Sequence, residues 1–383
     1  MMAAITAAER GHAVTLLEKN DRLGKKLAIT GGGRCNLTYN ADSEGLIRHV
    51  TGNPAFLYSS FYTFGSEALM DFFEKRRVSL KVENGRVFPK SDRAQDIVEA
   101  LEKALAKLQV RVLLNHPVTD IRQVFKEADR VIIATGGCSY PATGSTGDGY
   151  LWAKELGHTV TELYPSLVPL LVKETHISDL AGLSLREAGL TVTMPETLPE
   201  KMLFYGVGEL LFTHKGISGP LVLEASRHLV EYIQNKPFVA IDLMPNIDTG
   251  QLDKLLLQAI AEGPNKSIGN ILGGILPKRL APFLLEDPEE KANVFNKKAR
   301  ASLVKAIKSF GFTVVGTGGF REAMVTAGGV NVSGINPSDM SSKIVPGLYF
   351  AGEVLDVDAL TGGFNLQIAF STGYMAGCLG SVR

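Results

Sequence analysis

GLYFAGEVLDVDALTGGFNLQIAFSTGYMAG, residues 347–377, predicts a buried strand, a glycine-rich loop and a long helix. The strand ends at Gly352 and Glu353, and Gly362 and Gly363 lead into the helix. The first N–H groups of a helix have no partner within it, and its dipole is positive at that end. This helix start is therefore suited to stabilising negative charge in the crevice at the strand ends. A capped terminal helix lying on a sheet is the alternative, but it does not explain why Glu353 and the two glycines accompany the helix.

The opposite end of the chain, MMAAITAAERGHAVTLLEKN (residues 1–20), predicts a helix that ends at Gly11 and a buried strand that ends at Glu18. In a dinucleotide-binding unit, an acid at this place binds a ribose hydroxyl and follows a glycine fingerprint by about 20 residues. Counting back puts the last fingerprint glycine immediately before Met1. We therefore expect the first strand and the glycine-rich loop of such a unit to be missing. A surface helix, an ordinary strand and a chance Glu18 explain these residues equally well.

Two more glycine segments predict contact with a ligand. TGGGRCN (residues 30–36) offers consecutive N–H groups that no side chain covers, and Lys25 and Lys26 lie just upstream. Arg34 is suited to bidentate binding of a phosphate or carbonyl group. RVIIATGG (residues 130–137) is a predicted strand that ends in small residues, which let a ligand pass close to the backbone. A solvated loop and a plain strand with a turn are the respective alternatives.

The remaining pattern predicts an α/β fold: a Rossmann-like domain interrupted by an inserted β domain that carries a helical subdomain. VSLKVENGRVFPKS (residues 78–91) predicts a β-hairpin, and the helix that follows it is expected to be capped by Ser91 or Asp92. After residue 168 short strand patterns alternate with turns, and residues 249–310 become helical. The predicted boundaries are 1–167 and 335–383 for the Rossmann-like domain, 168–248 and 312–334 for the β domain, and 249–311 for the helical subdomain.

Composition limits the possible functions. The chain has 383 residues and a formal net charge of zero, which excludes a protein whose whole surface attracts nucleic acid. Cys35, Cys138 and Cys378 have neither disulfide-scaffold nor zinc-ligand spacing, so we expect a reducing cytoplasm and no metal. No run approaches the roughly 18 apolar residues of a membrane span, so no membrane partner is expected.

Four motifs together resemble a known family: GKKLAITGGGRCNLT (24–38), GELLFTHKGISGP (208–220), VTAGGV (325–330) and PGLYFAGEVLDVDALTGGFNLQIAFSTG (346–373). They are similar to bacterial FAD-dependent oxidoreductases labelled aminoacetone-oxidase-like, some of which are ribosomal-RNA dihydrouridine synthases. The resemblance covers nearly the whole chain and implies an FAD-binding Rossmann-like domain of the glutathione-reductase class. Members begin with a strand and a GGGxAG-like loop, so the resemblance also implies an N-terminally truncated chain.

By this resemblance FAD lies extended across the Rossmann-like domain. Glu18 is expected to hold the adenosine ribose, and Glu353 the ribitol. Val118 is expected to contact adenine from a strand that includes HPVTDI (116–121). The other residues expected to bind the cofactor are Lys19, Lys25, Lys26, Gly33, Arg34, Cys35, Asn36, Ala134, Thr135, Gly136, Gly352, Gly363, Phe364, Asn365 and Leu366.

The cofactor implies hydride transfer through the flavin, with NAD(P)H as a transient electron donor. VVGTGGF (314–320) is a further candidate glycine motif for a nucleotide site, but it leads into a predicted strand, which argues against that role. Cysteine pairs with CxxC or CxxxxC spacing are absent, which excludes a dithiol relay. Cys35 is a candidate proton donor, although a small packing residue is the favoured interpretation. His214 is a second catalytic candidate, and a structural hydrogen bond in a tight loop explains it equally well.

A basic helical segment gives the best indication of the substrate. Either a solvated face beside acidic residues or an RNA-contacting face explains these residues: Lys278, Arg279, Lys291, Lys297, Lys298, Arg300, Lys305 and Lys308. The first functional hypothesis is an FAD-dependent reductase of uridine in 23S ribosomal RNA. The second is an FAD-dependent oxidase or reductase of a small amine, ketone or steroid. The third is a non-catalytic binder of flavin or RNA, which the expected truncation motivates.

Overall fold

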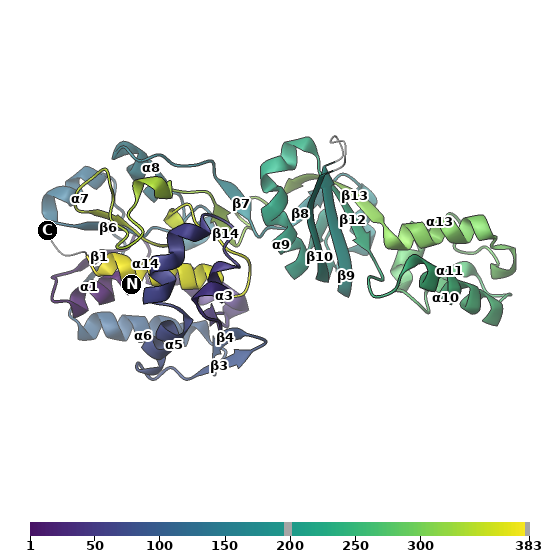
Figure 1. The fold of residues 1–383 in the computed structure, drawn as a ribbon, viewed down its shortest axis with the longest axis horizontal. Coiled ribbons are helices and arrows are strands. Elements are labelled where there is room, and N and C mark those ends of the chain that lie inside the picture. Colours follow the sequence, from purple (N-terminus) through teal and green to yellow (C-terminus); the bar gives the residue numbers. More distant parts are fainter. Residues whose placement is uncertain (195–200, 380–383) are drawn as a thin grey trace. The chain divides into compact units, whose positions relative to one another are not determined.

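The computed structural model describes residues 1–194 and 201–379, and the chain divides into two compact units (Figure 1). The first unit contains Met1–Ser166 and Gly319–Arg383, and the second is Leu167–Gly318. The second unit interrupts the first and contains a closed β-barrel. The predicted fold class, a Rossmann-like α/β domain with an inserted β domain, is therefore confirmed.

Short elements make up most of the first unit. Its helices are α1 (Met2–Glu9), α2 (Lys25–Ile29), α3 (Ser43–Ile47), α4 (Tyr58–Thr63), α5 (Ser66–Glu74), α6 (Ala94–Lys107), α7 (Ile121–Glu127), α8 (Asp148–Glu155) and α14 (Phe364–Gly377). Its strands are β1 (Thr15–Leu17), β2 (Thr38–Tyr39), β3 (Leu80–Glu83), β4 (Arg86–Pro89), β5 (Arg111–Leu113), β6 (Val131–Ile133), β7 (Tyr164–Ser166), β14 (Val325–Ala327) and β15 (Leu348–Phe350).

Parallel pairing within the first unit joins strands that are far apart in sequence. β1 pairs with β5, and β6 pairs with β15, in two separate two-stranded parallel sheets. The buried helix α14 lies beside α1 (Figure 1), and a Cβ on Gly377 would lie 2.5 Å from the Ala3 carbonyl oxygen. Glycine at this position therefore lets the two helices approach closely.

The second unit combines a barrel with a group of helices. The barrel order is β10-β11-β8-β13-β12-β9, and each pair is antiparallel. Its strands are β8 (Leu170–Val172), β9 (Ser184–Met194), β10 (Lys201–Phe212), β11 (Gly216–Ser218), β12 (Phe238–Asp242) and β13 (Phe310–Thr317). Its helices are α9 (Pro220–Leu229), α10 (Thr249–Glu262), α11 (Ile268–Leu272), α12 (Ala281–Leu284) and α13 (Lys297–Lys308).

The structure differs from the local predictions at identifiable places. The lysines and glycines before Arg34 do not form a plain loop: they lie in α2 and a 3₁₀ turn, because buried Leu27 anchors a run of helix formers. Neither Ser91 nor Asp92 is the N-cap of α6; Arg93 is, since the Asp92 carboxylate pairs with Arg34 and Lys81 instead.

Two predicted boundaries also differ. Residues 319–334 belong to the first unit, because β14 pairs antiparallel with β7, whereas the sequence pattern grouped them with the inserted β domain. The strand predicted to include Val118 ends at Leu113, so Val118 lies in a loop. β9 and β10, with 11 and 12 residues, are longer than the short strands that the pattern predicted.

Candidate functional site

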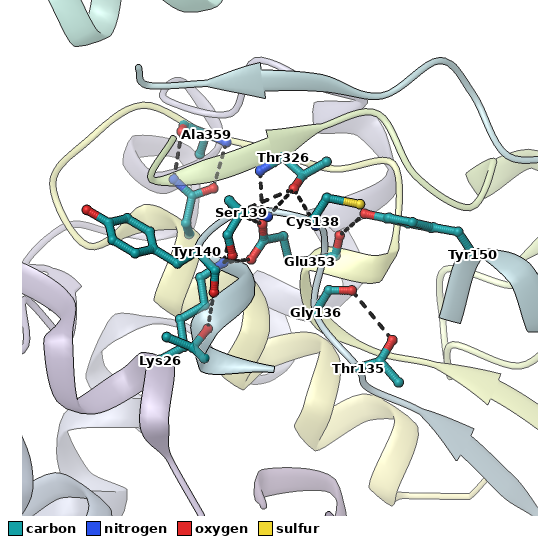
Figure 2. Close-up of polar contacts among 12 residues, drawn as sticks. Lys26, Thr135, Gly136, Cys138, Ser139, Tyr140, Tyr150, Thr326, Glu353 and Ala359 are labelled. Atoms are coloured by element: carbon teal, nitrogen blue, oxygen red, sulfur yellow. Dashed lines mark hydrogen bonds and ion pairs between the residues drawn. The ribbon is translucent and has the colours of Figure 1, made fainter. Parts of the chain in front are cut away.

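The carboxylate of Glu353 is the centre of a polar network within the first unit (Figure 2). Lys26 Nζ lies 2.7 Å from Glu353 Oε2. Glu353 Oε1 accepts hydrogen bonds from Ser139 Oγ at 2.7 Å and from the Thr326 backbone N–H at 2.9 Å. Lys26 also donates to Ser139 Oγ at 2.9 Å. The network therefore joins α2, the loop after β6, β14 and the turn after β15.

Small residues make room for this network. A Cβ on Gly137 would lie 2.4 Å from Thr326 Oγ1 and 2.8 Å from Glu353 Oε1. The glycines after β6 are thus needed for close packing of polar side chains, besides any contact with a ligand. Tyr150 donates from its hydroxyl to the Glu353 carbonyl oxygen at 3.2 Å, and burial raises the pKa of Tyr150. Tyr150 therefore stays a neutral donor at physiological pH.

Glu18 lies at a second polar corner, at the end of β1. Its Oε1 accepts hydrogen bonds from the backbone N–H and the Nδ2 of Asn20, at 2.9 and 2.8 Å. Lys19 pairs with Asp148 at 2.5 Å and donates to Thr146. Glu18 Oε2 has no hydrogen-bond partner within the described residues, so this oxygen can accept one from a ligand.

The loop after β5 runs beside the same corner. The backbone N–H of His116 donates to the Glu18 carbonyl oxygen at 2.9 Å. Val118 lies two residues beyond this contact. Lys25 pairs with Asp21 at 2.7 Å rather than with another part of the unit.

The glycine segment has left-handed backbone, as ligand-binding loops often have. Gly31, Gly32 and Gly33 have φ angles of 57°, 65° and 87°. A Cβ on Gly32 or Gly33 would meet no atom within 4 Å, so the backbone there is open to approach. Arg34 Nη2 pairs with Glu83 and Asp92, each at 2.6 Å, and its guanidinium lies over the Phe88 ring. Arg34 therefore ties the segment to the β3–β4 hairpin.

Cys35 and Asn36, which follow the glycines, have different environments. Cys35 has no exposed surface, and burial raises the pKa of its thiol to about 12. These observations favour the packing interpretation of Cys35 over the catalytic one. Asn36 Oδ1 is a buried acceptor without a hydrogen-bond partner in the described part of the chain. Because an unpaired buried acceptor costs roughly 1–3 kcal/mol, a donor from a ligand would stabilise this site.

The first turn of α14 lacks a cap. Gly363 is its N-cap residue, with a φ of 98°, and no side chain accepts a hydrogen bond from the helix start. Asn365 instead binds the preceding loop, accepting from Ala359 N–H at 3.0 Å and donating to the Ala359 carbonyl oxygen at 2.7 Å (Figure 2). The Phe364 ring stacks on His49 with centroids 4.3 Å apart. Leu366 belongs to the same turn. Because no side chain caps this turn, the positive end of the helix dipole stays available to a ligand.

These features fit the cofactor that the resemblance implies. The open backbone at Gly32 and Gly33 and the unpartnered Asn36 oxygen lie in one short segment. The Thr38 backbone brings that segment close to α14, since a Cβ on Gly363 would lie 2.7 Å from the Thr38 carbonyl oxygen. Donors, an acceptor and a helix start are the groups that an anionic, ring-bearing nucleotide needs.

The structure brings together only some of the predicted residues. Lys26 and Glu353 meet directly, while Ala134, Thr135 and Gly136 follow β6 on the way to Ser139. His214 lies in an exposed turn between β10 and β11 of the second unit. The sequence patterns did not single out Ser139, which closely follows the motif at 130–137, or Thr326, which lies inside VTAGGV; their hydroxyl groups were the available signal.

Four of the eight basic residues of the helical segment, including Lys291, which donates to the Asn265 carbonyl oxygen, are engaged inside the second unit. Arg300 is buried and pairs with Asp253 at 2.6 Å, and Lys308 pairs with Asp242 at 2.5 Å. Arg279 donates to the carbonyl oxygens of Asp179 and Ala181. Within residues 1–194 and 201–379, the side chains of these exposed lysines make no hydrogen bond or ion pair: Lys278, Lys297, Lys298 and Lys305.

The described residues contain neither a cluster suited to a metal ion nor a helix suited to span a membrane. Among these residues, no three or more His, Cys, Asp or Glu side chains gather in a way that could hold a metal ion. No described helix has both the length and the apolar character to cross a bilayer.

Cys35 is expected to resist alkylation in the native protein. Since the thiolate is the reactive form, a pKa of about 12 leaves roughly one ten-thousandth of Cys35 reactive near pH 8. This raised pKa stabilises the fold below the pKa of the unfolded thiol, and the benefit disappears as pH rises through about 12. Peptide mass mapping after brief iodoacetamide treatment should show Cys138 and Cys378 modified first. Equal labelling of Cys35 in native and urea-unfolded protein would contradict its burial.

Known proteins resemble the chain over nearly its full length. The family model described as HI0933-like protein Rossmann domain matches residues 1–379. A Clostridium scindens protein named 3-dehydro-bile acid delta(4,6)-reductase is 33% identical, with 98% of this chain and 95% of that protein covered. A Haemophilus influenzae protein named Ribosomal RNA dihydrouridine synthase is 32% identical, with 98% and 94% covered.

An Escherichia coli protein of the same name, Ribosomal RNA dihydrouridine synthase, is 31% identical, with 98% of this chain and 93% of that protein covered. Among solved structures, 3-ketosteroid-delta4-(5alpha)-dehydrogenase from Rhodococcus jostii, in complex with 4-androstene-3,17-dione, matches with a TM-score of 0.47. It is 14% identical, and the match covers 98% of this chain and 93% of that chain.

Proposed function

The chain belongs to the HI0933-like Rossmann-domain family of FAD-dependent oxidoreductases, and from this we propose that it reduces a carbon–carbon double bond conjugated to a carbonyl group. The names of its relatives share this chemistry. A dihydrouridine synthase saturates the uracil bond beside a carbonyl, and a delta(4,6)-reductase acts on the corresponding bonds of a 3-oxo steroid. We take uridine in 23S ribosomal RNA as the first candidate substrate and a steroid as the second.

The observations that support the proposal are the Glu353 network and the uncapped start of α14, which belong to the same unit. When bound and reduced by two electrons from NAD(P)H, the flavin would supply the hydride that such a reduction needs. Glu353 would offer carboxylate oxygens to the hydroxyl groups of the cofactor, and Lys26 would offer a cation to its negative charge. The first turn of α14 stabilises negative charge on the ring, since its N–H groups are fixed before the ligand arrives.

NAD(P)H is the electron donor that we propose. It would reach the flavin without a nucleotide-binding domain of its own, because the second candidate glycine motif, residues 314–320, lies largely within β13. The three cysteines are free, which favours a reducing cytoplasm as the place of action.

RNA and steroid substrates make different demands on the second unit. Exposed Lys297, Lys298 and Lys305 on α13 favour an RNA backbone contact. The 33% identity to a bile acid reductase favours a steroid. The internal pairing of Arg300 and Lys308 lowers the number of cations that are available to RNA.

Anaerobic turnover tests the proposal. Purified protein is loaded with FAD, given NADH or NADPH, and offered either a 23S ribosomal RNA transcript or a 3-oxo-4,6-diene steroid. We expect one substrate to gain two hydrogens by mass spectrometry, and the flavin absorbance to recover only when that substrate is present. FAD binding with no product from either class would contradict the proposed reaction and favour the non-catalytic binder. Rapid peroxide formation with an amine would favour the oxidase alternative.

Charge removal on α13 tells the two substrates apart. In the variant Lys297→Gln/Lys298→Gln/Lys305→Gln, we expect RNA affinity to fall and its salt dependence to weaken, since each phosphate contact releases a counterion. Steroid turnover should be unchanged in the same variant. The matched control is Lys75→Gln/Lys103→Gln/Lys126→Gln, which also removes three exposed lysines, all of them in the first unit. An equal loss of RNA affinity in both variants would show that net charge, rather than α13, is responsible.

A further inference from the structure

Gln367 is the centre of a fully buried polar cluster below the first turn of α14. Its Oε1 accepts a hydrogen bond from Thr38 Oγ1 at 2.5 Å. Its Nε2 donates to the Phe64 carbonyl oxygen at 3.0 Å and to Ser371 Oγ at 2.8 Å. Gln367, Thr38 and Ser371 each have no exposed surface. The cluster therefore joins three segments of the first unit by direct hydrogen bonds.

An amide is the side chain that this cluster requires. Thr38 Oγ1 needs an acceptor, while Ser371 Oγ, which already donates to the Phe64 carbonyl oxygen at 2.6 Å, needs a donor. A carboxylate cannot donate a hydrogen bond, and an apolar side chain can neither donate nor accept one. Either replacement leaves buried polar groups without partners, which is unfavourable.

The contact with Thr38 reaches the candidate cofactor site. Thr38 follows the glycine segment, and Asn36, with its unpartnered buried oxygen, lies two residues before it. On its other side, the Thr38 backbone is in close contact with Gly363, where a Cβ would lie 2.7 Å from Thr38 C and O. Gln367 thus ties β2 to α14 one turn from the helix start.

We propose that Gln367 is a positioning residue for the flavin, which acts by fixing the start of α14 relative to Thr38 and Asn36. This inference rests on the proposed function, because it requires bound FAD. The helix start stabilises the negative charge of the reduced ring more than the neutral oxidised ring. A helix start that drifts from β2 therefore lowers the reduction potential of bound FAD as well as its affinity.

The test compares single variants that break or keep the Thr38 contact. Thr38→Val and Gln367→Leu remove it, whereas Thr38→Ser keeps the hydroxyl group. Ser371→Ala is the matched control, since it damages the same buried cluster but leaves the contact between Gln367 and Thr38. The measurements are the FAD dissociation constant, the midpoint potential and visible spectrum of bound FAD, and the Tm of the protein without FAD.

We expect Thr38→Val and Gln367→Leu to weaken FAD binding roughly tenfold, as one lost buried hydrogen bond would, and to shift the potential to more negative values. Thr38→Ser should keep the FAD affinity and the midpoint potential of the wild type. Ser371→Ala should lower the Tm by a similar amount but leave the potential and spectrum as in the wild type. In Gln367→Glu, FAD affinity should recover as pH falls, because only a protonated carboxyl can donate to Ser371 or the Phe64 carbonyl.

Each outcome decides one question. If Thr38→Val and Gln367→Leu lower the Tm but leave the potential and spectrum unchanged, the cluster is only structural and the inference is overturned. If the Gln367 variants do not fold, the Thr38→Val and Thr38→Ser pair decides alone. If the wild-type protein itself binds no FAD, the proposed function fails, and that result is distinguishable from the failure of this inference.

Discussion

Glu353→Ala is expected to abolish stable FAD binding and to cause the largest loss of stability among the substitutions in the polar network. The carboxylate accepts hydrogen bonds from Ser139 and the Thr326 N–H, and it pairs with Lys26 at 2.7 Å. Its side chain is 19% exposed and that of Lys26 is 26% exposed, so solvent replaces the lost partners poorly. Removing one member of a buried ion pair costs roughly 3–5 kcal/mol, and with this partial exposure we expect about 2–3 kcal/mol.

The measurement is urea unfolding followed by tryptophan fluorescence, together with FAD titration. The chain has one tryptophan, Trp152 in α8, so its signal reports the first unit. Glu353→Gln serves as the matched control: it retains an oxygen for Ser139 and Thr326 but loses the charge that Lys26 needs. A double-mutant cycle with Lys26→Met then isolates the ion pair. A fully stable Glu353→Ala that binds FAD as tightly as the wild type would contradict a central role for the carboxylate.

The two ends of the site differ in how far sequence predicted them. The strand at Leu348–Phe350 and the helix at Phe364–Gly377 follow from a local apolar run, a pair of glycines and a long stretch without breakers. The partners of Glu353 do not follow from local pattern, because Lys26 lies 327 residues away and Ser139 lies 214 residues away. Only the folded chain brings these side chains together.

Arg34 illustrates why residue type alone was an insufficient guide. A guanidinium after three glycines suits an anionic ligand, but in the structure Glu83 and Asp92 provide the anions. Both acids come from the hairpin and the turn after it, which tertiary packing brings beside the segment. Arg300 and Lys308 repeat this outcome in the second unit, where nearby acids within the fold satisfy them. Counting charges in a sequence therefore overestimates the cations that remain available to a partner.

Gly363→Ala is expected to lower stability by about 3 kcal/mol and to weaken FAD binding, whereas Gly11→Ala should cost only about 1 kcal/mol. Both glycines have positive φ angles, 98° and 85°, so both substitutions add backbone strain. The two positions differ in the room that the fold leaves for a Cβ atom. A Cβ on Gly11 would meet no atom within 4 Å, but one on Gly363 would lie 2.7 Å from the backbone C and O of Thr38.

That difference makes the pair a measurement of how tightly β2 and the start of α14 must approach. Backbone atoms cannot rotate away as a side-chain end can, so the clash must move Thr38, the helix start or both. Such a movement separates the Asn36 oxygen from the first-turn N–H groups, and FAD affinity should fall together with stability. Urea unfolding with Trp152 fluorescence and FAD titration of both variants provide the check. Equal stabilities and equal FAD affinities would mean that the close contact at Gly363 has no part in shaping the site.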